Sequence, residues 1–326
     1  MIFKFEPIYK ERIWGGTKIR EYLNRDVPAC NHIGESWEIV DRDKDNSIIA
    51  NTIFKGKTLS ELLKSEGQSV MGPKWQTGKA FPLLVKWLDC SKRLSLQVHP
   101  PSEVAVKLCG EPKTENWYVA EASQDAGLFA GFKNGSSIES FRRALCHNEA
   151  ESLCHRFSSK KGDSILVESG RVHAIDSGNL ILEIQQNSDT TYRVYDWERL
   201  GLDGQPRTLH IEESMRCIDF NDHEPQPIST SSEKGMEIIA ESKFFRIRKF
   251  NLKQNDSIDL KNRNSDTLMI HALEGHLHAN DESLEKGEQA LIPFSSNCSI
   301  SCDAYASFLV TDRFSDIVTK EFPLSS

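Results

Sequence analysis

The stretch FPLLVKWLDCSKRLSLQVHP, residues 81–100, decides the fold of this chain. Its first part, Phe81–Asp89, is almost continuously apolar, which is typical of a strand buried on both faces. In the second part, Arg93–Pro100, polar and apolar residues alternate with the period of a strand. Leu94, Leu96 and Val98 form one face, and the other face is polar: Arg93, Ser95, Gln97 and His99. Polar side chains beside a buried strand need partners, so we expect partners from elsewhere in the chain.

Two other segments supply candidate partners. In TENWYVAEA, residues 114–122, Glu115 shares a strand face with Trp117, which predicts a carboxylate on a buried face. A buried carboxylate is costly unless it is paired or bound to a metal. The run GDSILVESGRVHAI, residues 162–175, predicts a strand, a Ser-Gly turn and then His173 among apolar neighbours.

These residues form a candidate metal site of Gln97, His99, Glu115 and His173. Two imidazoles, a carboxylate and an amide oxygen suit a borderline divalent ion, with zinc first and manganese, iron or cobalt as alternatives. Structural roles are the competing interpretation. Each histidine could be a packed strand residue, Gln97 could cap a sheet edge, and Glu115 could form an ion pair with Lys113.

Composition limits the classes of function. A length of 326 residues suggests about two domains, and a net charge of −8 argues against sequence-independent nucleic-acid binding. Eight cysteines without a CxxC pair predict reduced thiols and a cytoplasmic location. The first residues lack the apolar region of a signal peptide, and no run is long enough to span a bilayer, so we expect no membrane partner. The oligomeric state is not indicated.

The chain is expected to be mainly β. Short runs rich in Val, Ile, Phe, Tyr and Trp alternate with Gly, Asn, Asp and Ser turns, which indicates a barrel or sandwich. Three helical segments are predicted, near 58–67, 136–157 and 209–218. We predict a metal-binding domain over 1–220, a polar linker over 221–235 and a smaller C-terminal β domain over 236–326.

Three histidines of the C-terminal domain, His271, His276 and His278, suggest a second metal site beside Glu274. The surrounding run is instead typical of a hairpin with a Gly-containing turn, and no fourth ligand follows at a suitable place. We therefore favour a β domain without a metal site of its own.

Taken together, the motifs resemble the type I phosphomannose isomerase family, zinc-dependent cupins, in its shorter bacterial form. The resemblance covers most of residues 8–216 and rests on these stretches in order: IWGGTKI, IGESWEI, FPLLVKWLD, LSLQVHP, PKTENWY, residues 162–175, LEIQQNSDTTYRVYDW and RTLHIEES. It implies a cupin-type β-barrel or jelly roll with helical insertions, together with the smaller β domain in a bicupin-like arrangement.

The resemblance also implies roles for individual residues. One zinc ion would be bound by Gln97, His99, Glu115 and His173, while Arg193, Lys113 and Glu183 match the family's catalytic arginine, active-site lysine and a carboxylate of the pocket. The implied reaction interconverts mannose 6-phosphate and fructose 6-phosphate through an enediol. The chain departs from the family at Pro101-Ser102 and at Glu168–Arg171, which affects loop shape and not the predicted ligands.

Our hypotheses for the chemistry follow from these matches. In TTYRVYDW, residues 190–197, Arg193 alternates with aromatic residues, so it is expected either to stack on a ring or to meet an anion. We assign it to the developing oxyanion, and Lys113 and Ser95 to ring opening or phosphate binding. Glu183 is the first candidate for the general base, with Asp189 and a metal-bound water as rivals.

Two other functions are compatible with such a fold. A metal-dependent cupin oxygenase would use two histidines and a carboxylate on iron. The oxygenase is disfavoured by Gln97, which adds a further ligand. It is also disfavoured by Arg193 and Lys113, which suit an anionic sugar. A regulator on the same fold would bind a sugar phosphate without converting it.

Overall fold

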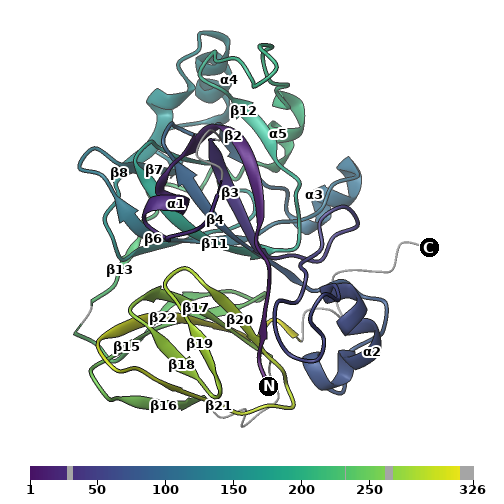
Figure 1. The fold of residues 1–326 in the computed structure, drawn as a ribbon. Helices are drawn as coiled ribbons and strands as arrows, with labels where there is room; N and C mark the ends of the chain where they lie inside the picture. Colours follow the sequence, from purple (N-terminus) through teal and green to yellow (C-terminus); the bar gives the residue numbers. More distant parts are fainter. Residues whose placement is uncertain (28–31, 232, 261–266, 316–326) are drawn as a thin grey trace. The chain divides into compact units, whose positions relative to one another are not determined.

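The computed structural model describes residues 1–27, 32–231, 233–260 and 267–315. It confirms a mainly β protein with several antiparallel sheets (Figure 1). The chain forms two compact units. Unit 1 comprises Met1–Ile8, Trp37–Lys86 and Thr230–Ser326, and unit 2 comprises Tyr9–Ser36 and Trp87–Ser229.

Unit 2 is built on two sheets. The larger has the order β13 (Ile228–Ser229), β9 (Asp163–Val167), β6 (Glu115–Ala122), β11 (Asn179–Gln186), β4 (Leu83–Cys90), β3 (Ile33–Ile39), β2 (Ile8–Gly16). Of these strands, Ile8 of β2, residues 37–39 of β3 and residues 83–86 of β4 belong to unit 1. The smaller has the order β12 (Tyr192–Tyr195), β5 (Leu96–Val98), β10 (His173–Ile175), β7 (Gly127–Phe132), β8 (Cys154–Ser158). Short helices complete the unit: α1 (Lys18–Glu21), α3 (Ser102–Ala105), η1 (Val106–Leu108), α4 (Ile138–Cys146), η2 (Ala150–Leu153) and α5 (Ile211–Cys217).

The two faces of β5 pack in different environments. Leu96 and Val98 belong to a buried cluster with Phe141 of α4 and Met215 of α5, so the apolar face of this strand lies under helices. A second cluster takes Trp117 and other residues from the larger sheet and Leu128 and its neighbours from the smaller one. Because successive strand residues point to opposite sides, the polar face of β5 is directed away from the helices.

The three predicted helical segments have different outcomes. Helix α2 (Leu59–Met71) begins with a capping box between Thr58 and Glu61, as expected at 58–67, and runs further. Helix α5 lies within 209–218. The prediction for 136–157 is wrong beyond α4, which ends at Cys146 before Asn148 takes a left-handed φ of 58°. The segment then forms η2 and β8, whose apolar spacing had resembled a continued helix.

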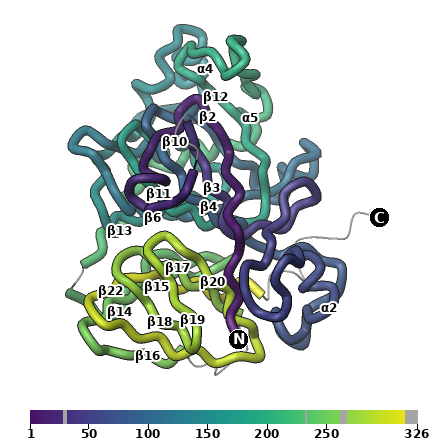
Figure 2. Tube along the Cα trace, in the orientation of Figure 1, coloured from purple at the N-terminus to yellow at the C-terminus, as the bar shows by residue number. Residues whose placement is uncertain are grey.

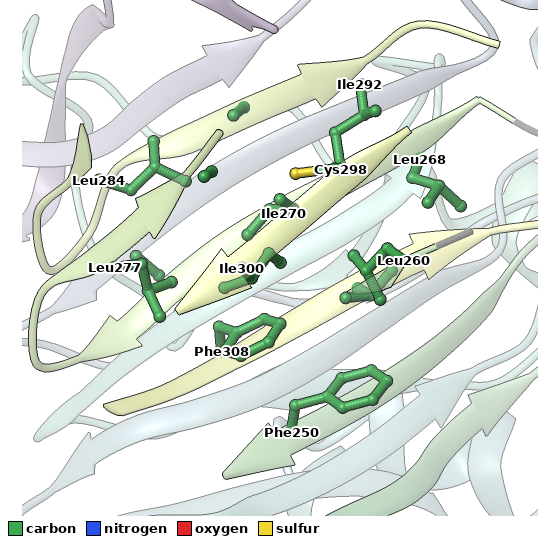
Figure 3. Close-up of a cluster of buried hydrophobic side chains, with 14 of the residues drawn as sticks. Phe250, Leu260, Leu268, Ile270, Leu277, Leu284, Ile292, Cys298, Ile300 and Phe308 are labelled. Carbon is green, nitrogen blue, oxygen red and sulfur yellow. The ribbon is translucent and has the colours of Figure 1, made fainter. Parts of the chain in front are cut away.

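Unit 1 contains a sandwich of two sheets and helix α2. Its sheets have the orders β1 (Phe3–Lys4), β20 (Gln289–Ile292), β17 (Leu268–Glu274), β22 (Ala306–Asp312), β15 (Arg246–Leu252), β14 (Met236–Glu241) and β16 (Ser257–Leu260), β21 (Cys298–Ser301), β18 (Leu277–Ala279), β19 (Glu282–Leu284). The buried cluster of Figure 3 takes residues from both sheets, and Phe250 stacks on Phe308 with ring centroids 5.3 Å apart.

The first residues of the chain belong to unit 1. Strand β1 pairs with β20, with Phe3 opposite Leu291. The N-terminal end of the tube lies near β20 in Figure 2. The compact units are therefore not continuous in sequence, and the contiguous limits of 1–220, 221–235 and 236–326 stay a prediction. In the part of the chain that the structure describes, no helix has the length and apolarity needed to cross a membrane.

Candidate metal centre and active site

Strand pairing in the smaller sheet of unit 2 brings three predicted site residues into one row. Gln97 of β5 lies opposite His173 of β10 on one side and Arg193 of β12 on the other. Directly opposed residues of antiparallel strands point to the same face of the sheet. The register therefore places these three side chains together on the polar face of β5.

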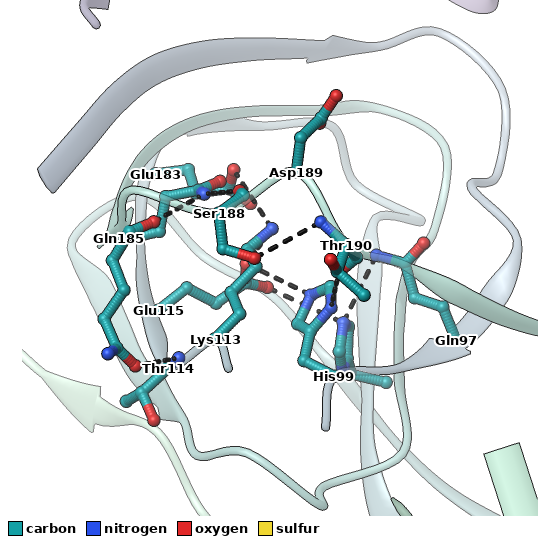
Figure 4. Close-up of polar contacts among 12 residues, drawn as sticks. Gln97, His99, Lys113, Thr114, Glu115, Glu183, Gln185, Ser188, Asp189 and Thr190 are labelled. Carbon is teal, nitrogen blue, oxygen red and sulfur yellow. Dashed lines mark hydrogen bonds and ion pairs between the residues drawn. The ribbon is translucent and has the colours of Figure 1, made fainter. Parts of the chain in front are cut away.

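The larger sheet supplies the carboxylates. Strands β6 and β11 pair Glu115 with Gln185 and Trp117 with Glu183, so both glutamates start from the same face of this sheet. Glu115 lies beside both histidines there, and Figure 4 labels it together with His99. Its Oε2 lies 3.4 Å from His99 Nε2, and its Oε1 lies 3.6 Å from His173 Nε2. His99, Glu115 and His173 are fully buried and their ligand atoms lie within 4.8 Å of one another.

Backbone carbonyls set the tautomer of each histidine. Nδ1 of His99 lies 2.9 Å from the Thr190 carbonyl, and Nδ1 of His173 lies 2.8 Å from the Arg171 carbonyl. A carbonyl oxygen only accepts, so each Nδ1 carries the proton and each Nε2 presents its lone pair toward Glu115. Burial is the largest cause that lowers the pKa of both imidazoles, that of His173 to about 3. Neutral imidazoles held in this way have the arrangement of metal ligands.

Lys113 shares the site with these groups. Its Nζ lies 2.7 Å from Glu115 Oε2 and 4.0 Å from Glu183 Oε1. Burial opposes both charges, but their attraction outweighs it and holds the pKa of Glu115 well below its usual range and that of Lys113 above it. The ion pair between Glu115 and Lys113, which the sequence offered as an alternative to metal binding, is therefore present beside the imidazoles.

Buried atoms without hydrogen-bond partners indicate whether a cation fits between the two histidines and Glu115. Among the described residues, His99 Nε2 and Glu115 Oε1 have no hydrogen-bond partner although both are buried. A buried carboxylate whose two oxygens each face an imidazole lone pair is costly without a cation. The donor set of two imidazole nitrogens and a carboxylate therefore fits a divalent metal ion.

Gln97 can supply a fourth metal ligand in one of its two amide orientations. Its Nε2 lies 3.2 Å from His173 Nε2, and its Oε1 accepts a hydrogen bond of 3.4 Å from Ser95 Oγ. Rotation of the amide by 180° exchanges these two atoms, and a bound cation would favour that orientation because only the amide oxygen has lone pairs to offer. The oxygen then faces the imidazoles, as a metal ligand would.

Glu183 and Asp189, the two candidate carboxylate bases, have different surroundings. Glu183 is buried, and its Oε2 accepts a hydrogen bond of 3.0 Å from Trp117 Nε1. Asp189 is exposed on the loop after β11. Only Glu183 is held in a defined position near Lys113.

Arg193 is half-buried, and its surroundings differ from the expected aromatic ones. Its Nη1 donates to the Thr208 carbonyl at 2.8 Å, and no ion pair or ring contact of its guanidinium occurs among the described residues. A register shift between Arg193 and Tyr195 breaks the alternation that predicted this aromatic face. The ring of Trp197 instead lies 4.6 Å from the guanidinium of Arg93.

The three C-terminal histidines each have a partner of their own. His271 is buried and contacts Gln289 and Thr311. The two partly exposed histidines pair with carboxylates, His276 with Glu285 and His278 with Asp303.

Comparison with known proteins identifies the family. A family model described as the type I phosphomannose isomerase catalytic domain matches residues 2–127. Mannose-6-phosphate isomerase ManA of Bacillus subtilis is 34% identical over 300 residues, which cover 89% of this chain and 92% of that protein. The chain belongs to the type I phosphomannose isomerase family. The predicted family and the predicted enzyme class, an isomerase, are thereby confirmed.

Solved structures of phosphomannose isomerases share the fold. The crystal structure of the mannose 6-phosphate isomerase from Bacillus subtilis has a TM-score of 0.83 and 31% identity, and covers 95% of this chain and 99% of its own. A zinc-bound mannose 6-phosphate isomerase has a TM-score of 0.73 at 15% identity, and covers 94% of this chain and 98% of its own.

The groups that hold the two histidines leave no signal in the amino-acid sequence. The carbonyls of Thr190 and Arg171 are backbone atoms, which any residue carries, so no residue type marks them in the sequence.

Proposed function

We propose that this phosphomannose isomerase is a zinc-dependent aldose–ketose isomerase that interconverts mannose 6-phosphate and fructose 6-phosphate through an enediol. One observation carries the proposal: the buried group of His99, Glu115 and His173 lies beside Lys113 and Glu183. The names of the relatives support the substrate, since the curated relative and the crystal structure from Bacillus subtilis are both named mannose 6-phosphate isomerase.

Zinc is the ion that we assign to the site. His99, Glu115 and His173 would hold it, with Gln97 as a fourth ligand through Oε1. The donor set is typical of zinc, and a related structure of the same fold is zinc-bound. When bound, the ion supplies a Lewis acid that polarises the oxygens of the sugar.

Glu183 is our candidate for the general base. The reaction removes the proton from C2 of the open-chain aldose and returns a proton to C1, so one group must accept and then donate. The Trp117 indole holds one carboxylate oxygen of Glu183, while the other faces Lys113 at 4.0 Å. A fixed, buried carboxylate suits this task better than the exposed Asp189.

Cationic groups would stabilise the negative charges of substrate and transition state. Among the described residues, Arg193 Nε is buried without a hydrogen-bond partner, so it has donor capacity for an oxyanion. Lys113 and the buried Ser95 are proposed to assist ring opening or phosphate binding.

A coupled assay from mannose 6-phosphate to fructose 6-phosphate, with metal analysis of the same sample, tests the proposal. Turnover with about one zinc per chain supports it. Oxygen uptake with bound ferrous iron would indicate the oxygenase, and binding of the sugar phosphate without turnover would indicate the regulator.

We further propose a cytoplasmic location. The described cysteines are all free thiols, and burial raises the pKa of Cys154 and Cys217 to about 12. Such a set of unpaired thiols is typical of a reducing compartment.

Removal of the metal is expected to abolish the isomerase activity reversibly. Dialysis against a chelator should stop turnover, because Lys113 and Arg193 alone cannot replace the polarising ion, and added Zn²⁺ should restore it. Activity that persists in a sample shown to be free of metal would contradict the zinc requirement.

Replacement of Glu183 with Gln is expected to stop exchange of the substrate's C2 proton with solvent and to lower turnover by about 10²–10⁴-fold. The amide can still accept the Trp117 N–H through its oxygen, so the fold should persist. Proton exchange in deuterated water measures the effect. The matched control is Asp189→Asn, and loss of exchange in that variant alone would assign the base to Asp189.

A further inference from the structure

The Thr190 carbonyl, which fixes the His99 tautomer, lies on the loop between β11 and β12. Loop carbonyls are free to turn toward solvent unless other contacts hold them. His99 Nδ1 reaches this oxygen at 2.9 Å across 91 positions of sequence. The geometry of the metal centre therefore depends on what holds this loop.

The side chain of Gln185 holds the start of the loop (Figure 4). It is fully buried, and its Nε2 donates to the carbonyls of Gln186 at 2.9 Å and Ser188 at 2.6 Å. Both acceptors are carbonyl oxygens, so the orientation of this amide is unambiguous. Among the described residues, its Oε1 has no partner. A buried amide oxygen without a hydrogen-bond partner lowers the stability of the folded protein, so the packing of this position does not by itself favour Gln185.

Ser188 connects this amide to Thr190. Its Oγ accepts a hydrogen bond of 3.2 Å from Thr190 N and donates one of 3.3 Å to the Glu111 carbonyl. The Thr190 hydroxyl in turn accepts from Glu111 N at 3.0 Å. These contacts hold Thr190 through its N–H and through its hydroxyl, and its carbonyl oxygen faces His99.

We propose that Gln185 is a positioning residue of the metal centre: its amide fixes the loop through Ser188, and the loop fixes the tautomer and orientation of His99. The inference rests on the proposed metal site for its effect on zinc affinity. The effect of Gln185 on the His99 tautomer does not depend on a bound metal.

The chain offers a matched pair of substitutions. Gln185→Glu preserves the shape of the side chain but places an oxygen against two carbonyls in place of the donor. Gln186 is the next residue, and its Oε1 accepts from Thr114 N at 2.8 Å. In the described structure its Nε2 has no hydrogen-bond partner, so Gln186→Glu also buries a carboxyl group but loses no bond.

The test measures the His99 tautomer by ¹⁵N NMR of the metal-free proteins and the zinc dissociation constant by competition with a chelator. Wild type and Gln186→Glu should show His99 protonated at Nδ1. Gln185→Glu should show a mixture of tautomers and bind zinc about 10–100-fold more weakly, the usual effect of losing an outer-shell contact.

Ser188→Ala is the second variant, for the case that Gln185→Glu does not fold. It removes the acceptor of Thr190 N, and it should shift the tautomer in the same direction. An unchanged tautomer in every folded variant of Gln185 and Ser188 overturns the inference, as does an equal loss of zinc affinity in Gln186→Glu. Wild-type protein that fails to bind zinc while its His99 tautomer responds to Gln185→Glu overturns the proposed function and leaves the positioning role standing.

Discussion

Replacement of His99 or His173 with alanine is expected to remove the bound metal and to lower turnover by at least about 10³-fold. Each imidazole presents a neutral Nε2 toward Glu115, and the described residues place no third imidazole in this group. A catalytic metal contributes several kcal/mol to transition-state stabilisation, and each 1.4 kcal/mol corresponds to a factor of ten in rate. The prediction is checked by measuring the metal content per chain and the turnover on the same sample of each variant.

His271→Ala is the matched control for these two variants. His271 is as buried as the two ligands, but it contacts Gln289 and Thr311 in the other compact unit. Its replacement is expected to lower thermal stability and to leave the metal content at the wild-type value. Stoichiometric zinc in both His99→Ala and His173→Ala would refute the ligand assignment.

Replacement of Arg193 with alanine is expected to lower turnover by about 10²–10³-fold with little loss of stability. The loss of one donor to a developing oxyanion has this magnitude in other enzymes. The stability effect should be small because the guanidinium makes one described hydrogen bond, to the Thr208 carbonyl. Turnover number and melting temperature, measured on the same preparation, separate the two effects.

Arg142→Ala controls for the loss of a positive charge. Arg142 is on α4, half-exposed, and pairs with Glu212 at 3.8 Å, so its removal should change neither turnover nor melting temperature appreciably. Arg193→Lys should recover only part of the activity, since an ammonium lacks the planar fork of donors. A fully active Arg193→Ala variant would rule out the oxyanion role.

Local periodicity predicted which side chains of the candidate site share a strand face. Alternation along β5 placed Gln97 and His99 on a polar face, and alternation along β6 placed Glu115 beside Trp117 on a buried one. The period of a strand depends on its backbone alone, so these assignments required no knowledge of the fold.

Periodicity failed where the backbone departs from its regular form. The register shift after Arg193 turned Tyr195 and Trp197 away from the expected face. The left-handed Asn148 ended a helix that the apolar spacing predicted as far as residue 157. Neither departure changes the residue pattern enough to be seen in a single sequence.

The amino-acid sequence was enough to establish the family and the β architecture, and to identify the group of His99, Glu115 and His173, because side-chain chemistry and strand period are local properties. Tertiary structure alone decided which imidazole nitrogens carry protons and how Gln185 holds the loop. Those features depend on backbone carbonyls that lie far away along the chain, such as Thr190 from His99, and a carbonyl is the same in every residue. Its direction is set only when the strands pair and the loop between them is fixed.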